Sequence, residues 1–205
     1  MTQFPQTKGG RTRQAVMDAA REVILSQGYT AASMRKISDA VGITPSAIYN
    51  HFASKEALFG ALLQEAVPIE EITVFFSEIT ADSAEALLGA VFRGLVTLFQ
   101  EHEDYIRLAL IDAQERDAAT LITFVPRLFP VLMQFGQRLQ ALDEGNGRLR
   151  PISLPILIRT LISLIGGYLL TERAVHPQQS LNLPQTDWVS GLLDILMYGV
   201  FYPEP

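Results

Sequence analysis

The 205-residue sequence contains no cysteine, one tryptophan and three histidines. Without cysteine, the chain can form no disulfide bond, thiol nucleophile or cysteine-ligated metal site. The histidines, His51, His102 and His176, are too scattered along the chain to predict a metal site. The sequence also lacks a glycine-rich nucleotide loop, a zinc-binding histidine pair and a hydrolase serine elbow. We therefore expect a protein that is not an enzyme and needs no cofactor.

Charge is distributed unevenly along the chain. The net charge is −6, but residues 1–60 hold seven basic and four acidic residues, and the remainder is strongly acidic. Phosphate contacts dominate the affinity of proteins for nucleic acids. The field of a charge decays within about 10 Å at ordinary salt, so the local balance matters more than the acidic whole. This pattern indicates nucleic-acid binding at the N-terminal end.

Residues 33–59, SMRKISDAVGITPSAIYNHFASKEALF, predict a helix-turn-helix. Ser33 and Thr44 are helix N-caps by type and position, and Pro45 suits a first helical turn because no N–H is needed there. Gly42 stands where a helix end requires a positive φ. Two short helices joined by a glycine-containing turn form this motif. The expected helices are 34–41 and 45–52.

The second of these helices is the right size to read DNA. The major groove admits one α-helix, and its base edges carry a readable pattern of hydrogen-bond donors and acceptors. The outward side chains of the segment can donate hydrogen bonds, and Ser54 begins a further helix whose N-terminus, near a lysine, suits a phosphate. The predicted DNA-binding residues are Ser33, Arg35, Thr44, Pro45, Ser46, Tyr49, Asn50, His51 and Lys55.

Residues 11–63 resemble the DNA-binding domain of the TetR family of bacterial transcriptional regulators. The resemblance is carried by residues 37–43 (ISDAVGI), 49–52 (YNHF) and 55–58 (KEAL) in one register. Pro45 departs from the family pattern, which often has a lysine or another polar residue there. The resemblance implies phosphate contacts for Tyr49, His51 and Lys55. Sequence-linked contacts are expected from Thr44, Ser46 and Asn50.

We expect an all-α fold with about nine helices. Residues 1–53 are predicted to form the three-helix DNA-binding domain, with 1–11 as a flexible arm that lacks the apolar core of a signal peptide. Residues 54–205 are predicted to form a larger helical domain for ligand binding and dimerisation. The first helix is expected over 12–27. The helix from Ser54 either kinks at Pro68 or ends there and restarts near Glu70, and we favour the kink.

The segment Pro151–Arg173 is apolar and long enough to raise the question of a membrane span. Pro155 and Arg159 argue against a span. The charge of Arg159, near the middle of a lone span, would cost about 2.5–3.5 kcal/mol. A helix buried between subunits explains the composition better. With Trp188–Phe201, this segment presents more apolar surface than a monomer needs. The resemblance implies that these two helices pair with their copies across a two-fold axis.

A ligand site is expected among the middle helices, because pockets in helical proteins lie between helices. The predicted lining residues are Phe92, Phe99, Tyr105, Arg107, Phe124, Met133 and Tyr168. The sequence thus predicts a cytoplasmic, ligand-responsive repressor that binds a palindromic double-stranded DNA operator as a homodimer. A small, largely apolar effector would release it. The alternatives are an activator of the same fold, or a small-molecule-binding dimer with weak or vestigial DNA binding.

Overall fold

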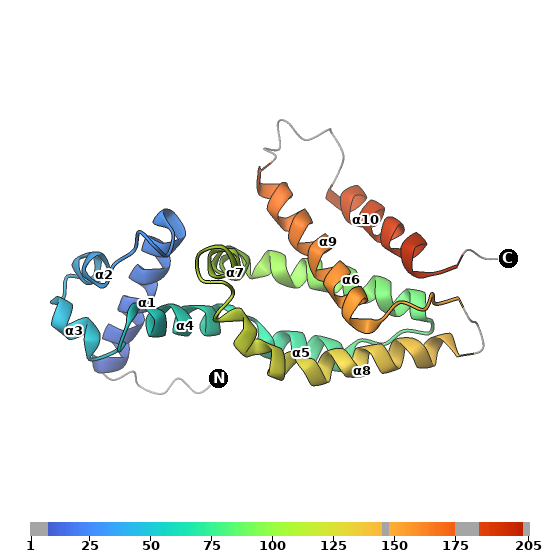
Figure 1. Ribbon diagram of the computed structural model, residues 1–205, viewed down its shortest axis with the longest axis horizontal. Coiled ribbons are helices and arrows are strands. Elements are labelled where there is room, and N and C mark those ends of the chain that lie inside the picture. Colours follow the sequence, from blue (N-terminus) through green and yellow to red (C-terminus); the bar gives the residue numbers. More distant parts are fainter. Residues whose placement is uncertain (1–7, 145–147, 175–184, 203–205) are drawn as a thin grey trace. The chain divides into compact units, whose positions relative to one another are not determined.

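The computed structural model describes residues 8–144, 148–174 and 185–202 (Figure 1). These residues are helical, apart from turns and one isolated antiparallel bridge between Leu149 and Phe201. The predicted all-α fold is confirmed. In chain order the helices are α1 (Lys8–Gln27), α2 (Met34–Val41), α3 (Pro45–Tyr49), α4 (Lys55–Ala66), α5 (Ile69–Glu78), α6 (Ala84–Glu101), α7 (Glu103–Glu115), the 3-10 helix η1 (Leu121–Phe124), α8 (Val125–Asp143), α9 (Leu154–Ala174) and α10 (Gln185–Val200).

The helices form two compact units. Unit 1 contains the described residues up to Pro68 together with 102–124, so α7 and η1 pack with α1–α4. Unit 2 contains residues 69–101 and the described residues from 125 onward. The predicted boundary between 53 and 54 divides the chain by function and stays a prediction. In the packing of the helices, residues 102–124 belong to the same unit as the helix-turn-helix.

Unit 1 is built around α1. This helix packs against α2, α4 and α7, and α2 in turn packs against α3. Because every one of these helices contributes apolar side chains, one core holds the motif in place. The fully buried side chains of this core include Val16, Ala20, Ile24, Ile37, Ile48, Leu58, Phe59, Leu62, Leu63 and Leu108.

Side-chain caps define the helix boundaries within the motif. The hydroxyl groups of Ser33, Thr44 and Ser54 each accept a hydrogen bond from a backbone N–H in the first turn of the following helix. Such a cap contributes about 1 kcal/mol. Gly42 ends α2 at φ 74°, a left-handed conformation that glycine adopts without steric cost. The cap and turn residues predicted from the sequence are confirmed.

Three predicted boundaries were wrong. The helix from Ser54 does not kink at Pro68; α4 ends at Ala66 and α5 begins at Ile69. The reason is the extended conformation of Val67 (ψ 123°), which a following proline favours. The first helix begins at Lys8, so residues 8–11 are helical and do not belong to a flexible arm. Residues 1–7 of that arm lie outside the described residues. The helix expected over 45–52 ends at Tyr49, and turns complete it.

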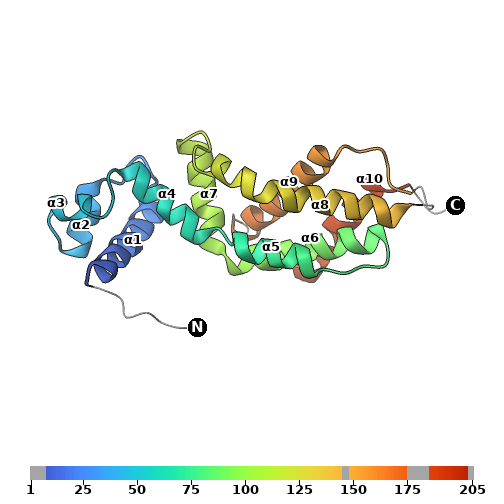
Figure 2. The same cartoon turned by 90° about the horizontal axis from the view of Figure 1, so that it is seen from below.

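In unit 2, α5, α6 and α8 lie side by side, and both α9 and α10 pack on α6 (Figures 1 and 2). Gly94 of α6 allows a close approach, because a Cβ there would lie 2.3 Å from the Phe75 ring of α5. Arg138 of α8 donates hydrogen bonds to the carbonyl oxygens of Phe76 and Ile79, at the end of α5. These contacts fix the three helices against one another.

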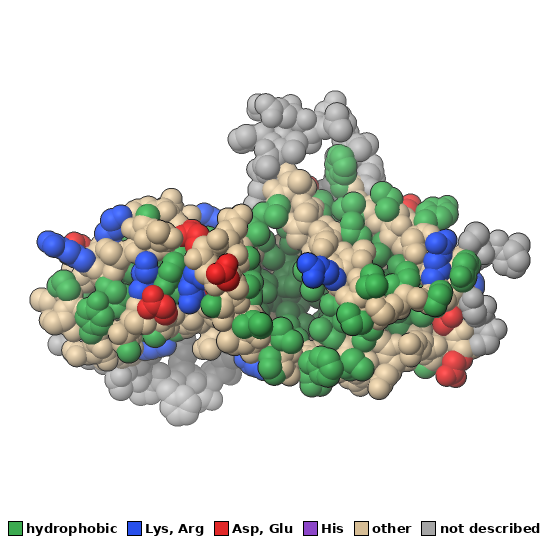
Figure 3. Space-filling model, viewed as in Figure 1, with side chains coloured by type: hydrophobic (Ala, Val, Ile, Leu, Met, Phe, Trp, Pro, Cys, Tyr) green, Lys and Arg blue, Asp and Glu red, His purple; other side chains and the backbone are tan. Residues whose placement is uncertain are grey.

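Helices α9 and α10 leave apolar side chains exposed. Figure 3 shows hydrophobic side chains at many points of the surface over unit 2. Residues Leu154–Glu172 are apolar and long enough to cross a membrane, although core helices meet the same criterion. Only 28% of that stretch is buried within the chain. Most of its residues are therefore at least partly exposed in the part of the chain that the structure describes. The exposed large side chains on these two helices are Ile156, Ile162, Leu170, Trp188, Ile195 and Tyr198.

Candidate DNA-binding site

Helix α3 is anchored by its apolar side and exposes its polar side. Ile48 is fully buried, and Phe52, just beyond the helix, is 4% exposed. Tyr49 is 54% exposed. An anchored helix with exposed polar groups on its outer side has the form of an element that enters a major groove. The other predicted contact residues that are exposed on or beside α3 are Thr44, Pro45, Ser46 and Asn50.

The start of α3 carries two adjacent hydroxyl groups. Thr44 Oγ1 accepts a hydrogen bond from the N–H of Ala47 at 3.3 Å and lies 3.0 Å from Ser46 Oγ. The cap therefore holds both side chains at the exposed N-terminus of α3. Hydroxyl groups can donate or accept, so this pair can contact either a base edge or a phosphate.

The remaining predicted contact residues differ in their exposure and in the hydrogen bonds that they form within the chain. Arg35 on α2 is exposed, whereas Ser33 is partly buried and occupied as a cap that accepts from the N–H of Lys36 at 3.2 Å. His51, in the turn after α3, is also partly buried. Arg35 is thus the freest cation of the predicted set, and Ser33 has a structural role whether or not it touches DNA.

Lys55 at the start of α4 is tied into unit 1. Its ammonium group donates to the carbonyl oxygens of Tyr29 and Ala32, both at 3.0 Å, and lies 4.1 Å from the centre of the Tyr29 ring. An ammonium group has three N–H donors, so these two bonds leave one for a phosphate. Sequence reasoning assigned Lys55 a phosphate contact and missed its role in holding the turn between α1 and α2.

Two further features of this region were not predicted. The Arg13 guanidinium stacks over the ring of Phe52, with 4.8 Å between its carbon and the ring centre. This contact sets an exposed cation of α1 beside the end of α3. At the other end of α1, the Glu115 carboxylate of α7 accepts from the backbone N–H groups of Tyr29 at 3.2 Å and Thr30 at 2.6 Å. Arg13 was visible as a basic residue on the first helix, but no local pattern marks Glu115.

These contacts shift the pKa values of Glu115 and Tyr29. Hydrogen bonds from the side chain and backbone of Thr30 hold the pKa of Glu115 below its ordinary value. Burial raises the pKa of Tyr29, and its hydrogen bond to Glu56 at 2.9 Å adds to the effect. At neutral pH the turn therefore contacts a charged carboxylate on one side and the Lys55 ammonium on the other.

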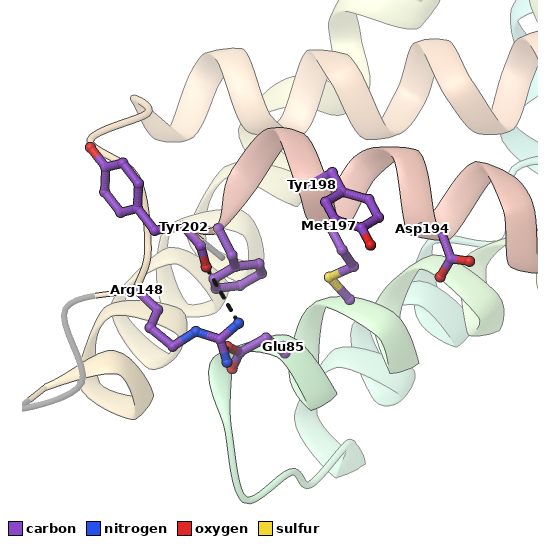
Figure 4. A pocket seen from close by; sticks show the side chains of 7 residues that line it. Glu85, Arg148, Asp194, Met197, Tyr198 and Tyr202 are labelled. Carbon is purple, nitrogen blue, oxygen red and sulfur yellow. Dashed lines mark hydrogen bonds and ion pairs between the residues drawn. The ribbon is translucent and has the colours of Figure 1, made fainter. Parts of the chain in front are cut away.

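A pocket of about 430 Å³ lies in unit 2, between α10 and the start of α6 (Figure 4). Met197 and Tyr198 lie between Asp194 on one side and an ion pair on the other. In that pair, Arg148 and Glu85 approach to 2.6 Å. The volume is in the range of small-molecule sites. Phe201 and Tyr202 complete the lining.

None of the seven predicted ligand-binding residues lines this pocket. Tyr105, Arg107 and Phe124 belong to unit 1, and the other four belong to unit 2. Arg107 donates a hydrogen bond to the carbonyl oxygen of Leu25 at 2.8 Å, near the end of α1. Phe92 is fully buried and Met133 is 40% exposed, while Phe99 and Tyr168 are partly and largely buried. The ligand role of these residues stays a prediction.

Comparison with known proteins identifies the motif. The family model described as "Bacterial regulatory proteins, tetR family" matches residues 16–62, which run from α1 into α4. The HTH-type transcriptional regulator UidR of Escherichia coli (strain K12) is 41% identical over 58 residues. The repressor AcnR of Corynebacterium glutamicum is 38% identical over 58 residues. These matches cover 28% of this chain and about 30% of the length of these curated relatives.

Solved structures extend the similarity to nearly the whole chain. NalD, the secondary repressor of the MexAB-OprM multidrug efflux pump in Pseudomonas aeruginosa, is 26% identical with a TM-score of 0.65. The similarity covers 95% of this chain and 98% of NalD. A TetR family transcription regulator from Marinobacter aquaeolei VT8 is 18% identical with a TM-score of 0.68, over 94% of this chain and 96% of that one.

Residues 16–62 match the TetR family by sequence, and the chain shares the helical fold of a solved TetR family regulator. The family model covers the segment in which sequence analysis found the resemblance, and the solved TetR structures share the complete helical fold. The similarity to the family therefore rests on sequence in the helix-turn-helix and on fold alone in the helices of unit 2. TetR regulators are generally not enzymes.

Proposed function

We propose that this protein is a ligand-responsive transcriptional repressor that binds a palindromic operator in double-stranded DNA as a homodimer. The observation that carries the proposal is α3, which is anchored by Ile48 and exposes Thr44, Ser46 and Asn50. AcnR and NalD, to which this chain is similar, are both repressors, and this supports repression as the outcome. Such a protein acts in the bacterial cytoplasm, where the DNA is.

The basic N-terminal part supports binding to the DNA backbone. Residues 1–60 carry a net positive charge on a chain of net charge −6. Arg13 is exposed on α1, and Arg35 is exposed on α2, the helix that packs against α3. Phosphate contacts from such cations position the protein, and base contacts from α3 specify the sequence.

The exposed apolar sides of α9 and α10 support a homodimer through Pro151–Arg173 and Trp188–Phe201. Ile162 and Ile195 are 65% and 67% exposed in the single chain. Gly166 and Gly167 have open space where a side chain would stand, which lets a second helix approach closely. A two-fold dimer presents two copies of α3 to half-sites about 34–36 Å apart, so the operator would be a near palindrome.

An effector would act by binding one arrangement of the dimer better than another. The pocket between α10 and α6 is one location for it, and the predicted set around Phe92 is the other. Replacing Met197 with Trp adds a larger side chain to the pocket lining, at a position outside the predicted set around Phe92. If the effector uses the pocket, M197W releases from DNA only at higher effector concentration. If it uses the predicted set, M197W responds as the wild type does.

Selection from a pool of random duplexes tests the proposed function. The purified full-length chain is mixed with the pool, and bound duplexes are recovered and sequenced. The proposal predicts enrichment of one sequence with two-fold symmetry. Placed over a promoter, that sequence should lower transcription when the protein is present. Raised transcription would indicate an activator, and recovery of random sequences alone would contradict specific DNA binding.

A further inference from the structure

We propose that Glu115, at the end of α7, is a positioning residue for the helix-turn-helix. It acts through the turn between α1 and α2, so that a segment about 85 residues away sets the orientation in which α2 and α3 meet DNA. The inference rests on the proposed function only where it concerns DNA binding. The contact itself is a property of unit 1.

The first support is the geometry of the carboxylate. Its two oxygens accept separately, Oε1 from the N–H of Tyr29 and Oε2 from the N–H of Thr30. The α1–α2 turn has no intrahelical partners for these N–H groups, because α1 ends at Gln27 and α2 begins at Met34. A charged acceptor forms stronger hydrogen bonds than a neutral one. Glu115 on α7 therefore supplies the acceptors for these two backbone N–H groups of the turn.

The second support is the space that Gly28 leaves. Gly28 adopts φ 84°, and a Cβ added there would lie 2.7 Å from Glu115 Oε1. The turn thus combines a left-handed residue with room for the carboxylate at the same position. Gly42, the other described glycine with positive φ, has nothing within 4 Å of its added Cβ. The comparison indicates that the Gly28 turn is shaped around the α7 side chain.

The third support is that the same turn reaches α4. Lys55 holds the carbonyl oxygens of Tyr29 and Ala32, and the Tyr29 ring packs edge-to-face on Phe59 at 5.1 Å between centroids. Arg116, next to Glu115, lies over both rings at 4.8 Å. The turn is therefore held between α4 and α7 directly before α2 begins. If its hold on α7 is lost, the turn that leads into α2 keeps its contacts with α4 alone of these two helices.

The direction of the change in DNA affinity distinguishes a positioning role for Glu115 from a purely electrostatic one. A carboxylate near a DNA-binding surface repels phosphates, so its removal should strengthen DNA binding if charge alone matters. Glu22 is a matched control, because it is an exposed glutamate on α1 of the same unit, and the hydrogen bond that it accepts among the described residues uses the backbone carbonyl and not the carboxylate. If Glu115 positions the motif, its removal should instead weaken DNA binding.

The experiment compares the full-length wild type, Glu115→Ala, Glu115→Gln and Glu22→Ala. Amide hydrogen exchange is measured without DNA over residues 28–41, and fluorescence anisotropy reports binding to the duplex selected above and to a scrambled duplex. In E115A we expect at least about tenfold faster exchange at Tyr29, at Thr30 and along α2. Binding to the selected duplex should weaken about tenfold, and binding to the scrambled duplex should not weaken. E115Q keeps one acceptor oxygen and should be intermediate on both measurements.

Three outcomes would overturn the inference. One is unchanged exchange at Tyr29 and Thr30 in E115A. A second is faster exchange confined to the turn, with α2 unaffected. A third is DNA binding by E115A that matches E22A. If the wild type selects no duplex, the proposed function fails, and the exchange of α2 alone still decides whether Glu115 positions the motif.

Discussion

The Glu115 carboxylate accepts a hydrogen bond from the backbone N–H of Thr30 at 2.6 Å, although 85 positions separate the two residues. Unit 1 is consequently made of two separate stretches of sequence, the N-terminal helices and the segment from His102 to Phe124. A motif that resembles a self-contained three-helix domain is in fact completed by a helix from the middle of the chain. The stability and the DNA binding of unit 1 should therefore respond to changes in α7.

Two glycine substitutions test the geometry of the turn. Gly42→Ala places a side chain at φ 74° in open space, so it should cost about 1–2 kcal/mol from backbone strain alone. Gly28→Ala adds a Cβ 2.7 Å from Glu115 Oε1, so the carboxylate must move away from the N–H groups of Tyr29 and Thr30 and the substitution should cost more. Denaturant unfolding measures both. In the E115A background the extra cost of G28A should disappear, with a coupling of about 0.5–3 kcal/mol. Equal costs for the two glycines in the wild type would contradict the contact.

Acid should weaken the same turn. The pKa of Glu115 is lowered in the folded protein, so its contribution to stability is present above the ordinary pKa of 4.5 and is lost as pH falls through the lowered pKa of the folded state. E115Q lacks this contribution at every pH. The difference in unfolding free energy between the wild type and E115Q should therefore be largest near neutral pH and shrink as the pH falls through the lowered pKa of Glu115. A difference that stays constant with pH would show that ionisation of Glu115 does not matter.

Lys55 should affect both stability and DNA binding. Its bonds to the Tyr29 and Ala32 carbonyl oxygens predict that Lys55→Ala lowers the unfolding free energy by about 1.5 kcal/mol. If its remaining donor contacts a phosphate, the slope of log affinity against log salt should also fall by about 0.9. Arg35→Ala is the control, because Arg35 is exposed and should change the slope without changing stability. An unchanged unfolding midpoint in K55A would contradict its structural role.

The exposed polar residues of α3 should read bases. Ser46→Ala and Asn50→Ala should each change preference by about 1–3 kcal/mol at one base pair of the operator. Their stability should change little, since both side chains are exposed. Anisotropy on a set of single-base operator variants measures this. R35A should instead weaken binding to every variant alike. Equal losses on all variants in S46A and N50A would exclude base reading.

The apolar sides of α9 and α10 should hold the dimer together. Ile162→Glu and Ile195→Glu should shift the protein to a species with the mass of one chain, 22.7 kDa, in sedimentation experiments. Val74→Glu is a matched control, because Val74 is 50% exposed on α5 of the same unit and outside the proposed interface. A wild type that sediments as one chain at micromolar concentration would contradict the proposed dimer.

Local chemistry made much of the fold predictable. Ser33, Gly42 and Thr44 act through groups within a few residues, so their roles can be read from neighbouring positions. The family resemblance covered the same short range. The end of α4 was open to two interpretations, because a proline permits either a kink or a stop, and the extended Val67 decides for the stop.

Long-range contacts could not be predicted. The bond between Glu115 and Thr30, and the bond between Arg107 and Leu25, join residues more than 80 positions apart, and neither residue type signals its partner. Arg107 was therefore assigned to a ligand site, although its guanidinium contacts α1. The pocket beside Met197 was missed for the same reason, since its lining comes from the start of α6, the residues after α8 and the end of α10.

Equilibrium binding to a half-site variant tests the central claim most directly. The full-length protein is titrated against the selected duplex and against the same duplex with one half-site scrambled, at several salt concentrations. We expect tight binding to the intact duplex that falls steeply as salt rises, and much weaker binding when either half-site is lost. Equal affinity for the intact and scrambled duplexes would contradict a dimer that reads two half-sites through α3.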